Sequence, residues 1–119
     1  MTDDRFKILK SKGLHFVHLN ACSIFHKIFE LILIEKEYSP AVISITETWL
    51  KKSDTDGCIG IDNYILLQRD RDSHAGGVCM FIRSDLAFNP LPDLQNENLD
   101  DLWAEILLPK MKPILVVTC

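Results

Sequence analysis

The stretch ISITETWL, Ile43 to Leu50, decides how this chain is read. Together with the two residues before it, it gives AVISIT, residues 41–46, a short and almost continuously apolar run that is typical of a strand buried on both faces. Glu47, which carries a carboxylate, follows immediately, and no turn-forming residue separates it from the strand. A buried strand that ends on glutamate either opens a surface loop or places the carboxylate there for a chemical purpose.

The residues before this strand predict a β-α-β unit. LHFVHLN, Leu14 to Asn20, has the apolar and β-branched content of a strand and follows a glycine. Ser23 is a candidate N-cap for a helix over Ile24–Tyr38, whose apolar residues follow helical spacing until Pro40 forces a stop. We therefore expect residues 14–20 and 41–46 to be adjacent parallel strands with the helix on one face of the sheet.

The second half of the chain predicts a run of strands. Four apolar segments are separated by turn-forming residues, which favours mainly antiparallel pairing. They are Tyr64–Arg69, Gly77–Arg83, Leu102–Leu108 and Pro113–Cys119. Since the last of these is very apolar and reaches the final residue of the sequence, we expect a fold that is cut short.

The composition is that of one globular domain. Of 119 residues, 47% are hydrophobic and 25% are charged, and the formal net charge of -4 does not mark a polyanion binder by bulk electrostatics. Residues 1–13 form a polar N-terminal leader without the apolar core of a signal peptide, and no apolar run is long enough to cross a membrane. A role on nucleic acid must therefore be argued from a site.

The cysteines point to a reducing compartment. Cys22, Cys58, Cys79 and Cys119 are scattered, with no C-x-x-C pair and no Cys/His cluster at zinc spacing. We expect them to be reduced thiols of an intracellular protein, nuclear or cytoplasmic.

Four segments together carry a resemblance to a known family. NACSIFHKIFEL, ISITETWL, YILLQRDRDSHAGGVCMFIR and DDLWAEILLPKMKPILVV, in this order, resemble the N-terminal half of the endonuclease/exonuclease/phosphatase superfamily. More specifically, they resemble the apurinic-type endonuclease domain at the front of non-LTR (LINE-like) retrotransposon polyproteins, which precedes the reverse transcriptase. The resemblance implies an α/β fold, a partial four-layer α/β sandwich in which residues 14–119 are a truncated domain.

The resemblance also implies a reaction and two site residues. It implies a Mg²⁺- or Mn²⁺-dependent endonuclease that nicks DNA by phosphodiester hydrolysis, with Glu47 binding the metal and Asn20 orienting metal and phosphate oxygens. The chemistry agrees, because Mg²⁺ prefers oxygen ligands and keeps several waters. Functional groups of α/β sheets also collect at the carboxyl ends of strands, where both residues are expected.

Ordinary structural roles remain open for these residues. Glu47 could begin a surface loop, and Asn20 could cap the following helix. His18 shares a strand face with Asn20, but a lone strand histidine is more often a hydrogen-bonded core residue, so it is not a site candidate.

Other motifs have ordinary structural interpretations as well. Asp70 and Asp72 could form a second metal pair but are more typical of a solvated hairpin, and Arg69 and Arg71 are too few to make a DNA-binding patch. The glycines of residues 75–77 favour a tight turn rather than phosphate binding, because a strand follows them.

Much of the family's chemistry has no counterpart in this sequence. A tyrosine after the last strand, a GDFN-like motif and an aspartate-histidine pair are absent, while Cys22 stands in place of arginine and Ala75 in place of glycine. We expect a fragment that is inactive alone, binds metal weakly and can self-associate through exposed apolar strands. The alternative is a non-catalytic remnant or interaction module with no nuclease role.

Overall fold

A parallel pair of strands organises the first half of the molecule. The computed structural model describes residues 14–50, 59–70 and 76–119, and the predicted leader 1–13 lies outside them. Strand β1 (Phe16–Asn20) pairs in parallel with β2 (Val42–Thr46), with Phe16 opposite Val42 and Asn20 opposite Thr46. The predicted adjacent parallel strands are confirmed, although each begins one or two residues later than expected.

The helix begins later than the sequence suggests. A 3-10 turn, η2 (Ile24–His26), comes first, and α1 spans Ile28–Tyr38. The predicted N-cap role of Ser23 is wrong: its φ is 89° and it forms no side-chain capping bond within the described residues. The amides of Ser23 and Ile24 instead donate to the Glu47 and Thr48 carbonyls at 3.0 Å each, so this segment stays paired with the chain after β2.

The remaining strands divide between two sheets. In the first sheet the order is β1-β2-β4-β3, so β4 (Val78–Arg83) lies antiparallel between β2 and β3 (Tyr64–Arg69). The second sheet has the order β5-β6-β7, all antiparallel, with β6 at Leu102–Leu107 and β7 at Ile114–Thr118. The mainly antiparallel run is therefore confirmed.

One strand was missed from the sequence. β5 (Ala87–Pro90) falls in a segment whose asparagine and prolines indicated a turn, and a further 3-10 turn, η4 (Pro92–Leu94), follows it. β5 forms the edge of its sheet, and Pro90 is its last residue, opposite Ala104. A proline is tolerated there because an edge strand does not need every amide for pairing.

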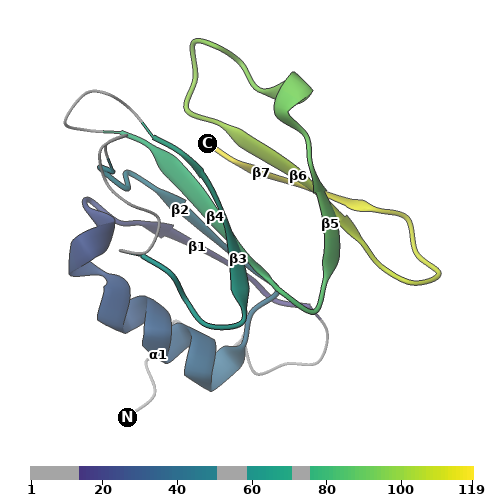
Figure 1. Cartoon of the computed structure of the whole chain (residues 1–119), viewed down its shortest axis with the longest axis horizontal. Helices are drawn as coiled ribbons and strands as arrows, with labels where there is room; N and C mark the ends of the chain where they lie inside the picture. Colours follow the sequence, from purple (N-terminus) through teal and green to yellow (C-terminus); the bar gives the residue numbers. More distant parts are fainter. Residues whose placement is uncertain (1–13, 51–58, 71–75) are drawn as a thin grey trace.

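Three layers result, with a core on each face of the first sheet (Figure 1). Between α1 and the sheet lie residues such as Leu31, Ile43 and Phe81. Between the two sheets lie residues such as Met80 and Ile106. Because successive β4 side chains enter opposite cores, five of its six residues are buried, which explains its nearly continuous apolar sequence.

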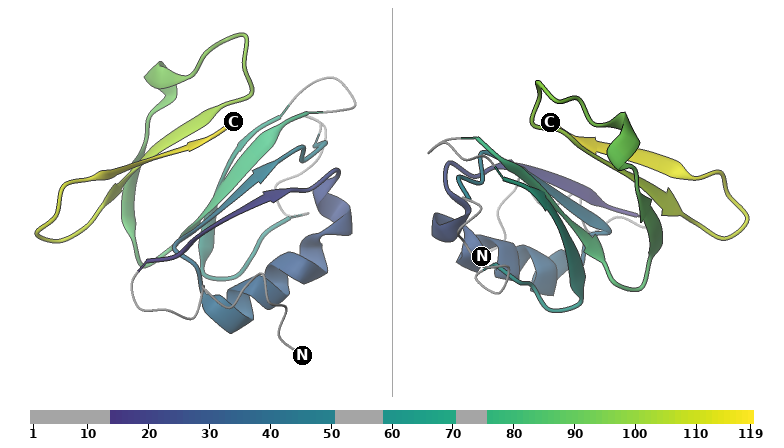
Figure 2. Two further views of the ribbon diagram at one scale, coloured as in Figure 1. Left: turned by 180° about the vertical axis from the view of Figure 1, so that it is seen from behind. Right: turned by 45° about the horizontal axis from the view of Figure 1, so that its top comes forward.

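A groove remains open between β1 and β7, which lie on the same side of the molecule (Figure 2). Its volume is about 460 Å³, and exposed apolar side chains line it. Phe16 is 44% exposed on β1, and Leu115 and Val117 are 54% and 38% exposed on β7. Within the described residues, β1 pairs only with β2 and β7 only with β6.

Over the same residues, no helix has the length and apolar character required to cross a bilayer.

Candidate metal site

Asn20 and Glu47 lie at the same edge of the first sheet. Asn20 is the last residue of β1 and is opposite Thr46, the residue before Glu47, in the parallel ladder. Backbone pairing continues past both strands, because the Ala21 amide donates to the Thr46 carbonyl at 2.9 Å and the Ser23 amide donates to the Glu47 carbonyl at 3.0 Å. The structure thus places the two residues that the sequence nominated at one edge of the sheet, while metal binding by them stays a prediction.

The Glu47 carboxylate is held in place by two donors. Its Oε2 accepts the indole N–H of Trp49 at 2.8 Å and the backbone N–H of Gly76 at 3.1 Å. The residue itself has a left-handed backbone, φ 54°, immediately after β2. Because both bonds engage the same oxygen of a half-buried side chain, the carboxylate has a fixed orientation rather than that of a freely solvated loop residue.

Asn20 is exposed and does not cap a helix. Its Oδ1 accepts a hydrogen bond from the Cys22 thiol at 3.3 Å, and the capping positions of η2 and α1 are occupied by Ser23 and Lys27. The amide oxygen therefore lies at the strand-end edge, next to an exposed cysteine.

His18 faces the groove rather than the core. Its Nδ1 lies 3.2 Å from the Ser44 hydroxyl, which in turn lies 2.7 Å from the Thr118 hydroxyl of β7. The expectation of a hydrogen bond is confirmed, whereas the expected core position is wrong because His18 is exposed. The side chains of His18, Ser44 and Thr118 thus link the two sheets, two residues before Asn20 on β1.

The acidic residues around Gly76 and Gly77 extend the site. Asp70 directly follows β3, which pairs antiparallel with β4, so the expected hairpin position is confirmed; it is half-buried rather than solvated and accepts a hydrogen bond from the Gln68 side chain at 2.8 Å. Asp72 falls outside the described residues. Asp100, which sequence reasoning missed, accepts the Gly77 N–H at 3.1 Å. The signal available was the pair of aspartates directly before a strand, in DDLWAEI.

The glycines themselves confirm part of the sequence interpretation. Gly76 and Gly77 have φ values of 92° and 86°, in the region that glycine adopts most readily, so they do form a tight connection. Their N–H groups are directed to carboxylates, those of Glu47 and Asp100.

The donor set suits a largely hydrated ion. Asn20 and Glu47 offer hard oxygen donors, which match Mg²⁺, an ion that often takes one or two carboxylates and several waters. Over residues 14–50, 59–70 and 76–119, no cluster of three or more His, Cys, Asp or Glu side chains is arranged to hold a metal. The residues present therefore fit weak rather than tight coordination.

The thiols differ in their surroundings. Cys22, Cys79 and Cys119 are free, as expected, while Cys58 lies outside the described residues. Burial raises the pKa of the Cys79 thiol, and the nearby Asp70 carboxylate raises it further. Cys79 is thus an inert core residue, and Cys22 is the exposed thiol beside the site.

Comparison with solved structures places the fold. No protein-family model matches the sequence, and no curated protein matches it either. The AP endonuclease LMAP from Leishmania major is similar over 88% of this chain, with 17% identity and a TM-score of 0.69. The 3' phosphatase NExo from Neisseria, solved with a product DNA hairpin, is similar over 88% with 13% identity and a TM-score of 0.60. An AP endonuclease from Archaeoglobus fulgidus is similar over 87% of this chain, with 15% identity and a TM-score of 0.56.

The likeness shows the fold and its extent. This chain spans about two fifths of each solved protein, 39% of the Leishmania enzyme and 40% of the other two. It therefore shares the α/β fold of part of these solved proteins, in agreement with the partial α/β sandwich expected from the sequence.

Proposed function

We propose that this chain forms the metal-binding part of a Mg²⁺-dependent DNA endonuclease of the kind found in LINE-like retrotransposons. The observation that carries the proposal is the position of Asn20 and Glu47 at neighbouring strand ends of a parallel pair. The fold supports it, because the similar solved proteins are AP endonucleases and a 3' phosphatase bound to product DNA. Such a protein acts inside the cell, in the nucleus or the cytoplasm.

The two residues have distinct roles in this proposal. Glu47 binds Mg²⁺ or Mn²⁺ through its carboxylate, and the Asn20 amide oxygen orients the ion and a phosphate oxygen. The bonds from Trp49 and Gly76 to Oε2 keep the Glu47 side chain from rotating away, so its orientation is set before an ion arrives. When bound, the ion supplies charge stabilisation to a phosphodiester and its leaving oxygen.

This chain alone is proposed to lack catalysis. Phosphodiester hydrolysis needs a group to activate water and a group to protonate the leaving oxygen, or a metal in their place. His18 is engaged by Ser44 on the groove side, and the described residues hold no metal cluster of three or more ligating side chains. The same finding favours the second candidate, a non-catalytic remnant or interaction module.

Self-association is the other property that we propose. The groove between β1 and β7 exposes apolar side chains beside two strand edges that carry no neighbour in the described residues. Unpaired edges next to an apolar face are sites of strand addition. We propose that copies of the chain associate there.

Metal titration tests the main proposal. Mn²⁺ binding is measured by water-proton relaxation for the 119-residue chain, for Glu47→Gln and for the control Glu37→Gln at the far end of α1. We expect weak binding that Glu47→Gln reduces and Glu37→Gln leaves unchanged. Plasmid nicking with Mg²⁺ is expected to be absent in all three. Mn²⁺ binding that is equal in the parent and in Glu47→Gln contradicts the proposal.

A further inference from the structure

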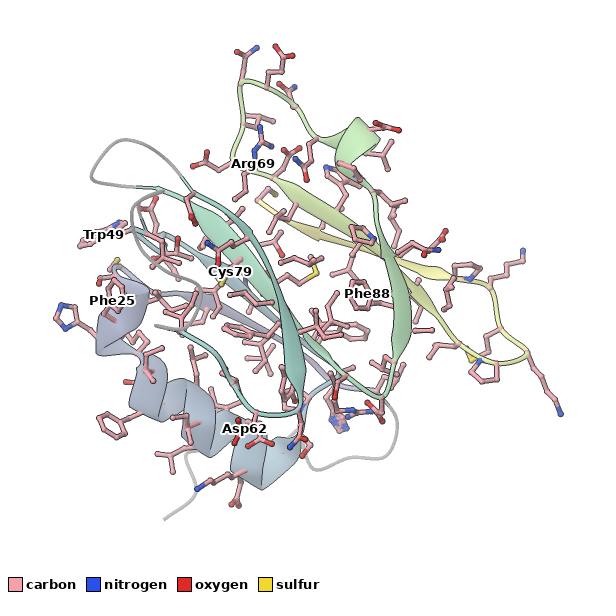
Figure 3. The ribbon with its side chains drawn as sticks, in the orientation of Figure 1. Phe25, Trp49, Asp62, Arg69, Cys79 and Phe88 are labelled. Carbon is pink, nitrogen blue, oxygen red and sulfur yellow. The ribbon has the colours of Figure 1, made fainter. Side chains whose placement is uncertain are left out.

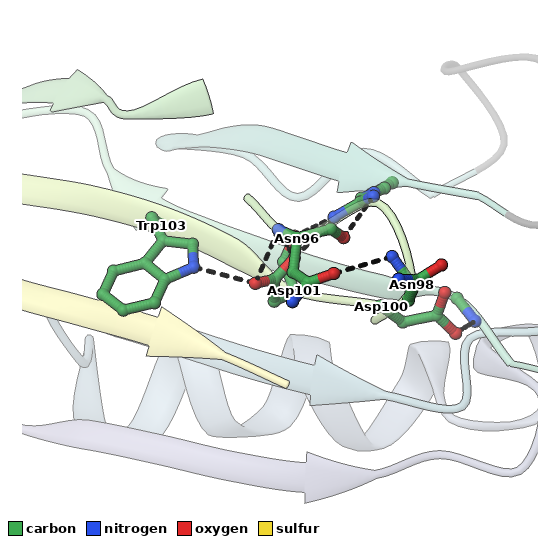
Figure 4. Close-up of polar contacts among 7 residues, drawn as sticks. Asn96, Asn98, Asp100, Asp101 and Trp103 are labelled. Carbon is green, nitrogen blue, oxygen red and sulfur yellow. Dashed lines mark hydrogen bonds and ion pairs between the residues drawn. The ribbon is translucent and has the colours of Figure 1, made fainter. Parts of the chain in front are cut away.

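Arg69 joins the end of β3 to the connection that precedes β6. Its Nη1 donates to Oδ1 of Asp101 at 2.5 Å and to the Asp101 carbonyl at 3.0 Å, and its Nη2 donates to the Asn96 carbonyl at 2.9 Å. Three bonds from one guanidinium fix residues 96–101 against the first sheet. We name this set of contacts the Arg69 clamp. Figure 4 shows Asn96 and Asp101 of this connection together with Trp103.

The second carboxylate oxygen of Asp101 is also hydrogen-bonded. Asp101 is only 4% exposed, and its Oδ2 accepts the Trp103 indole N–H at 3.0 Å and the Asn96 amide at 3.2 Å. A buried carboxylate with this many donors is fixed in position, since each lost bond would leave a buried polar group without its partner. The clamp is therefore a rigid part of the fold.

The residue next to the clamp reaches the candidate metal site. Asp100 accepts the Gly77 N–H through Oδ2 at 3.1 Å, and the preceding amide, that of Gly76, donates to Oε2 of Glu47 at 3.1 Å. Two consecutive amides thus bind two carboxylates, one just after β2 of the first sheet and one in the connection before β6 of the second. Arg69 and Trp49 lie toward the same end of the molecule (Figure 3).

The carbonyl groups of the glycine segment are held by hydrogen bonds as well. The carbonyls of Gly76 and Gly77 accept the amides of Trp49 and Thr48, at 2.9 and 3.2 Å. If the Asp100 contact is removed, the Gly77 amide loses an acceptor and the segment gains freedom to turn its N–H groups away. Glu47 would then keep the Trp49 bond but lose a fixed second donor.

We infer that Asp100, carried by the Arg69 clamp, is a positioning residue for the Glu47 carboxylate and acts through the Gly76–Gly77 amides. The inference rests on the proposed function, in which Glu47 is the metal ligand. Asp100 itself does not touch the ion. Its effect is to hold the amide that orients Oε2, so that the carboxylate presents the same geometry to each ion that binds.

The experiment compares two substitutions at one position. Asp100→Ala removes the acceptor for Gly77, while Asp100→Asn removes the charge but keeps an acceptor oxygen. Mn²⁺ affinity is measured by water-proton relaxation for both, with Asp93→Ala as a control that removes an exposed carboxylate of η4. We expect Asp100→Ala to weaken binding roughly tenfold, the scale at which supports of metal ligands act, and Asp100→Asn to restore most of it.

A second measurement reports geometry rather than affinity. The chain is labelled with 5-fluorotryptophan, and the Trp49 resonance is assigned with Trp49→Phe. Asp100→Ala should shift this resonance, because the Trp49 indole shares Oε2 of Glu47 with the Gly76 amide. Arg69→Lys cannot make the same three bonds, so it should also weaken Mn²⁺ binding and shift the Trp49 resonance in the same direction as Asp100→Ala. It replaces Asp100→Ala in both measurements if that variant does not fold.

The outcomes separate the inference from the function on which it rests. Equal weakening by Asp100→Ala and Asp100→Asn would mean that Asp100 acts through its charge, which overturns positioning. Weakening by Glu47→Gln but by neither Asp100→Ala nor Arg69→Lys overturns the inference and leaves the proposed function standing. Unchanged binding in Glu47→Gln overturns the proposed function and, with it, the positioning of a metal ligand.

Discussion

The indole N–H of Trp49 donates to Oε2 of Glu47 at 2.8 Å, two residues along the same chain. The contact joins a half-buried aromatic ring to the carboxylate that we propose as a metal ligand. It makes Trp49 both a support for Glu47 and a natural reporter of what happens there.

Trp49→Phe tests this support. The substitution keeps an aromatic ring but removes the donor, because only the indole carries an N–H. A hydrogen bond of this kind contributes about 1 kcal/mol net, so Mn²⁺ affinity should fall roughly five-fold. Tyr38→Phe is the matched control, since it also keeps an aromatic ring and removes a polar group, at the last residue of α1. An equal loss of affinity in both variants would indicate a general effect on the fold.

Cys22 should report binding at Asn20. Its thiol donates to Oδ1 of Asn20 at 3.3 Å and is exposed, so an ion held by that oxygen would change the reaction of Cys22 with an alkylating reagent. In a chain carrying Cys58→Ser and Cys119→Ser, we expect Mg²⁺ to alter the alkylation rate of Cys22.

Cys79 provides the internal comparison in the same protein. It is fully buried, and burial raises its pKa, so the thiolate that reacts is nearly absent. Cys79 should react only after denaturant unfolds the chain. Rapid labelling of Cys79 in native buffer would show that the helix-side core is not closed.

Acid should weaken the Arg69 clamp through Asp101. The Trp103 hydrogen bond lowers the pKa of Asp101 below its usual 3.8, and the Asn96 amide and Arg69 lower it further, whereas burial opposes them. Because the folded-state pKa is the lower one, the stabilisation is present above pH 3.8 and is lost as pH falls through the folded value.

Urea unfolding at several pH values checks this sign. Asp101→Asn should lower the free energy of unfolding near neutral pH. Its difference from the parent should narrow as pH falls below 3.8 towards the lowered folded-state pKa, since protonation of Asp101 then removes the same charge. A difference that stays constant across that range would mean that the carboxylate charge contributes nothing to the clamp.

The groove between β1 and β7 should govern self-association. Light scattering is expected to show particles larger than a monomer for the parent chain and a smaller species for Leu115→Lys with Val117→Lys, because charges on an edge strand oppose pairing. Phe29→Lys is the control, since Phe29 is 84% exposed on α1 and lies away from the groove. Dispersal by Phe29→Lys alone would assign association to the helix.

The predictable part of the fold is the part governed by local periodicity. The bounds of β3 match the sequence prediction at both ends, and those of β4 and β6 differ by one residue, because long apolar runs between turn residues leave little choice. The helix start could not be predicted, since it depends on backbone bonds from Ser23 and Ile24 to residues 47–48, which are distant in sequence.

The same distinction applies to the site. Asn20 and Glu47 could be nominated because the family resemblance implies them, and their expected places at the carboxyl ends of two parallel strands agree with it. For Asp100 the sequence offered only the pair of aspartates before a strand, because its place beside the Gly77 amide requires the second sheet to pack on the first. Non-local packing of this kind leaves no periodic trace in a sequence.

β4 has one further consequence. Its residues 78–82 are apolar and buried on both faces, so a slip of one position against β2 or β3 would exchange one set of apolar side chains for another at little cost in burial. The features that oppose such a slip lie at its ends, where Gly77 binds Asp100 and the Arg83 amide binds the Ala41 carbonyl. Damage to the glycine end would therefore produce a misregistered isomer, a chain that is still folded and still rich in strand, but whose Glu47 carboxylate no longer meets the Gly76 amide.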